Sequence, residues 1–324
     1  MKNLFLINSV FQALIFFSCE NPPVNYETEL YQSKGVFYKL KHNKPYTGIT
    51  FSNYINGNKK STGNLIEGKK NGLWKYWFEN GNPKSEENFL NGQPDGERLL
   101  WYENNKLKLK CFFKNGILDG VQTEWYDNGN KKEQGSFKKN MFDDKWTSWF
   151  PNGKKKAEGV YLNNKENGIH TQWHPNGKIK SKAEFLDGKI SGLRTEWYDN
   201  GQKKEEGTVN GFWVSWFPNG KKESQGKFIK QMPEGKHTIW YNNGQKKSEV
   251  NFKNRKPNGF SISWYDNGQK KSEVNFRNGK PNGFSISWYD NGQKREEGYN
   301  QNGNRTGQWV YYNQDGSLDG TEDY

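Results

Sequence analysis

The sequence predicts an all-β fold: an elongated antiparallel β-meander of about twelve 24-residue hairpin repeats, forming an open, twisted, single-layer sheet. Three observations predict it. Asn-Gly and related turn dipeptides recur every 24 residues from Asn56-Gly57 to Asp315-Gly316, with one shorter step of 19 residues from Asn200 to Asn219. A glycine series and a tryptophan series keep the same spacing. Within a repeat, apolar and polar residues alternate, as in a strand with one apolar face.

The composition fits such a thin sheet and excludes a large enzyme domain with a thick aliphatic core. Leu, Ile, Val and Phe together make up less than a fifth of the 324 residues, whereas aromatic residues make up 16%. Disordered chains are poor in aromatic residues, so we expect this chain to fold. The net charge is +13, but acidic residues are interspersed among the basic ones, which are mostly lysine. This pattern favours a solvated surface, and nucleic acid is not an expected partner.

Residues 1–19 have the pattern of a secretory signal. Lys2 provides a short positive region, and residues 4–17 form an apolar stretch that is too short and too polar to span a bilayer. Ser18 and Cys19 follow, before a polar segment. This junction resembles a bacterial lipoprotein lipobox, in which the cysteine is lipidated and becomes the first mature residue. An ordinary cleaved signal and an uncleaved anchor are the alternatives.

The lipobox resemblance implies a protein of the bacterial cell envelope, anchored to the membrane through Cys19 or secreted, rather than a cytoplasmic protein. We expect three parts: a signal peptide at 1–19, a tether at 20–34, and a repeat array at 35–324 with a short repeat near 201–211. Cys111 is the other of only two cysteines, so lipidation of Cys19 leaves no intramolecular disulfide.

The turn chemistry predicts which residues share a face of the sheet. Proline precedes Asn-Gly in several repeats, and proline favours the first central position of a type I turn. We therefore predict a three-residue loop with Gly in the left-handed bulge position. Such a loop puts Trp264 beside Ser272, Val274 and Phe276, whereas a two-residue turn would put it beside Glu273.

The tryptophans that keep the 24-residue spacing form the candidate aromatic interaction face. In a single-layer sheet, part of this aromatic ribbon can stay open to a partner. The alternative is that the ribbon is only the apolar layer of the sheet. These residues are Trp77, Trp101, Trp125, Trp149, Trp173, Trp197, Trp216, Trp240, Trp264 and Trp288.

The sequence predicts no catalytic constellation, no metal site and no cofactor, and hence no enzyme. The histidines lack metal-ligand spacing, and we expect His170, His174 and His237 on the surface. Cys111 occupies the slot of a valine in later repeats, which predicts a small core residue. The regularly spaced Lys and Glu residues are expected to form cross-strand ladders.

The repeating pattern G-x-x-x-x-W-[YF]-x-N-G-x-K-K-x-E-x-x-[FY]-x-N-G-K-x-x-G resembles the MORN repeat, in the variant class of YwqK-type toxin–antitoxin antitoxins. The clearest copies are 259–283 and 283–307, and the resemblance covers about residues 35–324. It implies an array of β-hairpins that binds proteins or phospholipids.

Three functions follow as hypotheses. The first is a non-enzymatic, envelope-anchored repeat scaffold that mediates protein–protein interaction with an unknown partner. The second, implied by the antitoxin resemblance, is an antitoxin that binds and neutralises a partner toxin. The third is binding of phospholipid or cell-wall glycan by the aromatic or basic face, with a membrane surface as the partner.

Overall fold

The computed structural model describes residues 22–324, and its secondary structure is entirely β, which confirms the predicted fold class. The predicted signal peptide and Cys19 lie outside the described residues. The described chain divides into two compact units, one that ends at Ile117 and one that spans Leu118–Tyr324, named here the N-terminal and the C-terminal unit.

The N-terminal unit is a meander of hairpins preceded by a small cap of short strands. β4 to β9 pair in sequence order and antiparallel, β1 pairs in parallel with β4, and β2 and β3 form a separate two-stranded sheet. The strands are β1 (Val24–Asn25), β2 (Leu30–Ser33), β3 (Val36–Lys39), β4 (Gly48–Asn53), β5 (Lys59–Ile66), β6 (Lys69–Trp77), β7 (Pro83–Leu90), β8 (Gln93–Trp101) and β9 (Leu107–Lys114); the division between the units falls within β10 (Ile117–Leu118).

Within the predicted tether at 20–34 the chain forms short strands: β1 pairs with β4, and β2 pairs with β3 in the separate two-stranded sheet. Val24 and Leu30 are buried in one core cluster with Leu65 and Trp74. Each buried aliphatic side chain contributes about 1.5–3 kcal/mol, enough to hold such short strands in place. The sequence pattern did not reveal them, because they precede the first 24-residue repeat.

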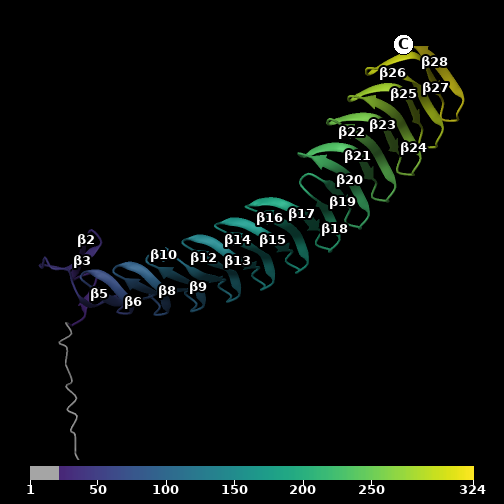
Figure 1. Ribbon diagram of the computed structural model, residues 1–324. Helices are drawn as coiled ribbons and strands as arrows, with labels where there is room; N and C mark the ends of the chain where they lie inside the picture. Colours follow the sequence, from purple (N-terminus) through teal and green to yellow (C-terminus); the bar gives the residue numbers. More distant parts are fainter. Residues whose placement is uncertain (1–21) are drawn as a thin grey trace, which may run out of the picture. The chain divides into compact units, whose positions relative to one another are not determined.

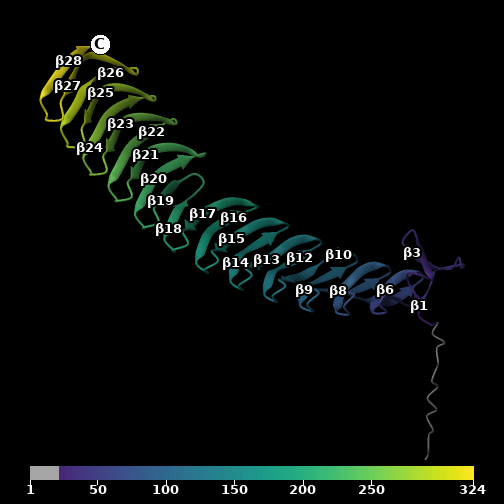
Figure 2. The ribbon, with the colours of Figure 1, turned by 180° about the vertical axis from the view of Figure 1, so that it is seen from behind.

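The C-terminal unit is a single open antiparallel meander. From β11 to β28, each strand pairs with its neighbours in the chain. Figure 1 shows this order within the unit, and Figure 2 shows it from behind. The strands are β11 (Gly120–Trp125), β12 (Lys131–Lys138), β13 (Met141–Trp149), β14 (Lys155–Leu162), β15 (Lys165–Trp173), β16 (Ile179–Leu186), β17 (Lys189–Trp197), β18 (Lys203–Gly207), β19 (Phe212–Trp216), β20 (Lys222–Ile229), β21 (Met232–Trp240), β22 (Lys246–Lys253), β23 (Lys256–Trp264), β24 (Lys270–Arg277), β25 (Lys280–Trp288), β26 (Lys294–Gln301), β27 (Asn304–Tyr312) and β28 (Leu318–Asp323).

The Asn-Gly turn is the predicted three-residue loop. After Trp264, Gly268 N–H donates to the carbonyl of Tyr265 at 3.0 Å, and Tyr265 N–H donates to the carbonyl of Gln269 at 2.9 Å. Gly268 has φ +88°, in the left-handed region that glycine enters without strain. The predicted loop type is therefore confirmed.

The predicted face of the tryptophan is wrong, because a bulge follows the loop. Trp264 pairs with Lys270, and the register shifts by one residue directly beside this pair. A shift of one residue turns the side chains of the following strand to the opposite face. As a result Ile262 pairs with Glu273, and Trp264 shares their face rather than that of Phe276.

The sheet therefore has two different faces. The tryptophan face carries the repeat tryptophans and the residues that alternate with them, such as Phe260, Ile262 and Glu273. The packed face carries the residues in between, such as Ser261 and its partner Val274.

The asparagine of the turn joins two neighbouring repeats. Asn267 Oδ1 accepts the N–H of Gln269 at 3.0 Å, and Asn267 Nδ2 donates to the carbonyl of Asp290 in the next repeat at 2.7 Å. An aspartate could make only the first of these bonds. The same donation to the next repeat is made by Asn128, Asn152, Asn176, Asn200, Asn219, Asn243 and Asn291.

We predict that Asn267→Asp lowers the free energy of unfolding by about 1 kcal/mol, the net contribution of the single hydrogen bond that it removes. Asn267→Ala removes both bonds and should cost about 2 kcal/mol. Asp315→Asn is the matched control, because Asp315 Oδ1 already accepts the N–H of Ser317 at 2.8 Å. Urea unfolding checks the order, and equal effects of the two Asn267 variants would refute the bridging role.

Candidate interaction site

The ten predicted tryptophans occupy equivalent places in the fold. Each is the last residue of its strand; Trp77 and Trp101 lie in the N-terminal unit, and the other eight lie in the C-terminal unit. All ten are half-buried. The structure therefore places them in equivalent environments, but their rings are not an open apolar ribbon.

Lysine side chains cover many of these rings. In the C-terminal unit, a lysine from the preceding repeat holds its ammonium 5.5–5.7 Å from the ring centroid of Trp149, Trp173, Trp216, Trp240, Trp264 or Trp288. Such a contact contributes about 0.5–1 kcal/mol at an exposed site. In these six repeats the lysine after the preceding turn thus shields the tryptophan from solvent, whereas Leu107 and Ile179 stand at this position for Trp125 and Trp197.

Four of these six lysines also pair with glutamates on the tryptophan face, whereas Lys131 and Lys222 donate to glutamines. Lys155 Nζ lies 2.8 Å from Glu158 Oε2, and Lys203 Nζ lies 2.7 Å from Glu206 Oε2. The hydrogen bond from Lys155 lowers the pKa of Glu158, and that from Lys203 lowers the pKa of Glu206. Much of the positive charge on this face is therefore compensated locally.

These depressed pKa values predict a loss of stability in acid. A carboxylate whose folded pKa lies below its unfolded value stabilises the fold above the unfolded value, and this contribution is lost as the pH falls through the folded pKa. We expect the urea midpoint to stay constant from about pH 8 to about pH 5 and to fall below the ordinary glutamate pKa of 4.5. Lys155→Met should show a smaller acid loss than the wild type, and a midpoint that rises on acidification would contradict the prediction.

The open apolar surface lies four residues before the tryptophans, on the same face. In the C-terminal unit this open row consists of side chains that are 40–62% exposed. It was not predicted, although the same 24-residue spacing marks it. Its members are Val121, Ile169, Leu193, Phe212, Phe260 and Phe284.

The packed face holds a second set of aromatic rings, which the sequence pattern did not predict. Trp74 and Trp309 are 0% and 4% exposed, and each indole lies against a glycine of the preceding strand, Gly63 or Gly298. Trp146 and Trp213 occupy the equivalent places over Gly135 and Gly207. A glycine eleven residues before a tryptophan is the sequence signal of this contact in all but the short repeat.

Two histidines replace tryptophan in this set, so their predicted place on the surface is wrong. The His170 ring lies over Gly159 between the rings of Tyr161 and Phe185, with centroids 5.1 Å away on each side. Its Nε2 bonds to the carbonyl of Val160 at 2.8 Å. His237 makes the equivalent contacts with Phe228, Phe252 and the carbonyl of Lys227.

The sizes of paired residues on the packed face compensate each other. A glycine on one strand faces a Trp or His on the following strand, as Gly298 faces Trp309. Val274 instead faces the small Ser285. Val250 and Ser261 repeat the second combination. Close packing explains this combination in these repeats. At the same position of the N-terminal unit two large side chains, Glu87 and Arg98, pair instead and lie 3.5 Å apart as an ion pair.

The described residues show no arrangement for catalysis by a metal. Across residues 22–324, no three His, Cys, Asp or Glu side chains gather closely enough to hold an ion, and no helix there could cross a membrane. Cys111 is buried, as predicted, and burial raises the pKa of its thiol.

The repeats match a known family along more than half of the chain. The MORN repeat variant profile matches residues 70–91, 94–115, 118–139, 145–163, 166–187, 190–210, 233–254 and 258–278. The chain belongs to the MORN repeat variant family. Each of these MORN segments ends at or near a hairpin tip, which is the tight turn at the end of the hairpin opposite the Asn-Gly loop, such as Asp187-Gly188 between β16 and β17.

Solved structures add nothing to this assignment. The MORN array is similar to chains in crystal structures of TcdB2-TccC3-Cdc42 and TcdB2-TccC3-TEV, with 14% and 12% identity and TM-scores of 0.19 and 0.18. The matches cover 86% and 87% of this chain but only 16% of each solved chain. TM-scores this low do not indicate a shared overall fold. No curated protein matches the chain.

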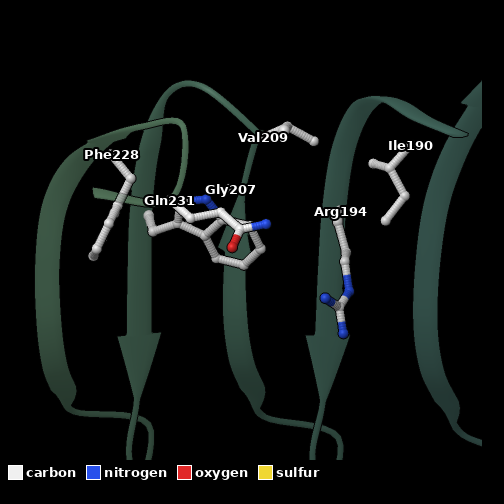
Figure 3. A pocket seen from close by; sticks show the side chains of 7 residues that line it. Ile190, Arg194, Gly207, Val209, Phe228 and Gln231 are labelled. Carbon is white, nitrogen blue, oxygen red and sulfur yellow. The ribbon is translucent and has the colours of Figure 1, made fainter. Parts of the chain in front are cut away.

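One MORN repeat in the C-terminal unit departs from the others. The short repeat forms β18 and β19, which are joined by a loop that lacks five residues of the usual hairpin tip. Beside this loop lies a cavity of about 380 Å³. Figure 3 shows Ile190 and Arg194 on one side, Phe228 and Gln231 on the other, and Val209 between them. We call this site the notch.

Proposed function

We propose that this protein is a non-enzymatic MORN-type scaffold of the bacterial cell envelope that binds a protein partner through the open row of its tryptophan face. The observation that carries the proposal is the row itself. Exposed apolar side chains at one repeated position form an interaction surface, because burying them in a partner gains free energy.

Phe212, Phe260 and Phe284 supply the largest side chains of the row, and aromatic residues are enriched in the contacts that dominate binding energy. Lys155, Lys203 and Lys270 on this face are paired with glutamates, which disfavours an anionic lipid surface as the main ligand. These observations favour a protein over a phospholipid or a charged cell-wall polymer.

The experiment is affinity capture from the source cells with the wild-type chain and two triple variants. The row variant carries Phe212→Ser, Phe260→Ser and Phe284→Ser. The control carries Leu162→Ser, Leu186→Ser and Ile229→Ser, which are similarly exposed but lie at the hairpin tips. A specific partner should be captured by the wild type and by the control but lost from the row variant. Equal capture by all three chains would refute the role of the row.

Anchoring at the envelope is tested separately through Cys19. We expect the wild type in the membrane fraction with lipid attached, and Cys19→Ala in the soluble or secreted fraction. A lipid-free wild type, or a Cys19→Ala chain that remains fully in the membrane fraction, would refute the anchor. If the captured partner is a toxin that this chain neutralises, the antitoxin reading replaces that of a general scaffold.

A further inference from the structure

The short repeat interrupts a regular backbone contact between hairpin tips. In ordinary repeats the tip residue donates its N–H to the carbonyl of the second strand residue after the preceding tip, as Gly188 does to Glu166 at 2.9 Å and Gly279 does to Pro257 at 2.8 Å. Ile190 holds the acceptor position for the tip that is missing from the short repeat. Its carbonyl therefore faces the place where one hairpin tip is absent.

The missing tip also leaves a strand edge uncovered. β15 pairs with β16 from Gly168 to Trp173, whereas β17 pairs with β18 only from Arg194 to Trp197. Gly192 and Leu193, which correspond to Gly168 and Ile169 of the ordinary repeat, therefore lack their strand partner on the β18 side within the described chain. An uncovered edge of this kind pairs readily with an extended segment of another chain.

The packed face explains what the notch lacks. Each ordinary repeat near the notch places an aromatic ring just before its tip: Tyr161, Phe185, Phe228 and Phe252. The short repeat has Val209 at this position, and the cavity lies beside it, against Trp213 and Phe228. Its lining is mostly apolar, and Arg194 at its border is already paired with Glu196 and Glu205. The cavity is thus suited to an uncharged ring.

We propose that the notch binds a segment of a partner protein that carries an aromatic residue directly ahead of a tight turn, and so takes the place of the missing hairpin tip. The aromatic ring fills the cavity between Val209 and Phe228. The backbone of the segment pairs with the free edge of β17 and donates to the carbonyl of Ile190. The notch is on the packed face and the open row is on the tryptophan face, so the two sites can be tested independently.

The test uses a labelled peptide with the sequence of residues 183–192, Ala-Glu-Phe-Leu-Asp-Gly-Lys-Ile-Ser-Gly, which is the tip of the preceding repeat. Fluorescence anisotropy measures its binding to the full chain. We expect saturable binding with one site, and a loss of about 10- to 100-fold when the peptide phenylalanine is replaced by serine, the factor that corresponds to burying one such side chain.

Two variants of the chain locate the site. In the graft, residues 208–211 are replaced by the nine-residue sequence of residues 184–192, which restores a repeat of ordinary length and fills the notch. Val209→Arg is the second variant; Val209 is 45% exposed, so this change should not disturb folding. Both should bind the peptide at least about 10-fold more weakly than the wild type, while the row variant should bind it unchanged.

Three outcomes would overturn the proposal. The first is equal binding of the phenylalanine and serine peptides, and the second is unchanged binding to Val209→Arg. The third is self-association of the wild type that the graft abolishes, measured by sedimentation. This result would show that a tip of a second copy, rather than a partner protein, occupies the notch.

Discussion

Replacing Gly298 with valine is expected to lower the free energy of unfolding by about 3 kcal/mol, because a Cβ atom at this position would overlap the indole of Trp309. The indole is nearly fully buried, and its Nε1 donates to the carbonyl of Tyr299 at 3.1 Å, so it cannot move aside without losing this bond. Trp309→Ser alone should cost about 3–5 kcal/mol through the cavity that it leaves.

The double variant Gly298→Val with Trp309→Ser should recover much of this loss. It recreates the combination that the chain already uses at Val274 and Ser285. We expect a favourable coupling energy of about 2 kcal/mol in a double-mutant cycle measured by urea unfolding. Additive losses would contradict the compensation of sizes across the packed face.

Trp74→Ala is expected to cost about 3–5 kcal/mol, whereas Trp77→Ala, three residues along the same strand, should cost about 1 kcal/mol. Trp74 is fully buried over Gly63. Its ring centroid lies 5.5 Å from that of Tyr26 and 4.5 Å from the ammonium of Lys70. Trp77 is half-buried on the tryptophan face.

The two tryptophans thus test which series of rings stabilises the N-terminal unit. Urea unfolding followed by circular dichroism measures both variants, and Trp74→Phe is the control that keeps an apolar ring. A loss for Trp77→Ala as large as that for Trp74→Ala would show that the half-buried series forms the core after all.

The architecture could be predicted from the sequence, because turn residues at regular spacing mark the ends of every strand. The 24-residue spacing, the Asn-Gly dipeptides and the alternation of apolar residues all depend on local geometry, and the hairpins and three-residue loops follow from them. The cap at residues 24–33 was missed because it precedes the first repeat and is held by the distant β4, Leu65 and Trp74 as well as by its own hairpin.

The faces of the sheet could not be predicted in the same way. The bulge beside Trp264 adds one residue to the second strand, and no residue type at that point demands it. Because one extra residue reverses the alternation, it moved the repeat tryptophans to the face that also carries Glu273.

The candidate site was predicted only in part. The ten repeat tryptophans were placed in equivalent environments, but the open row lies four residues earlier and their own rings lie beneath lysines in several repeats. The packed-face rings did have a signal, a glycine eleven residues before Trp74, Trp146 and Trp309, which becomes meaningful only when the register of the strands is known.

Photo-crosslinking tests most directly whether the tryptophan face is the one that meets the partner. A photo-reactive phenylalanine derivative is placed at Phe260, in the open row, or at Phe276, which lies on the packed face beside Gly259 in the same hairpin. We predict that the captured partner crosslinks from position 260 and not from position 276. Crosslinking from position 276 alone would contradict the account.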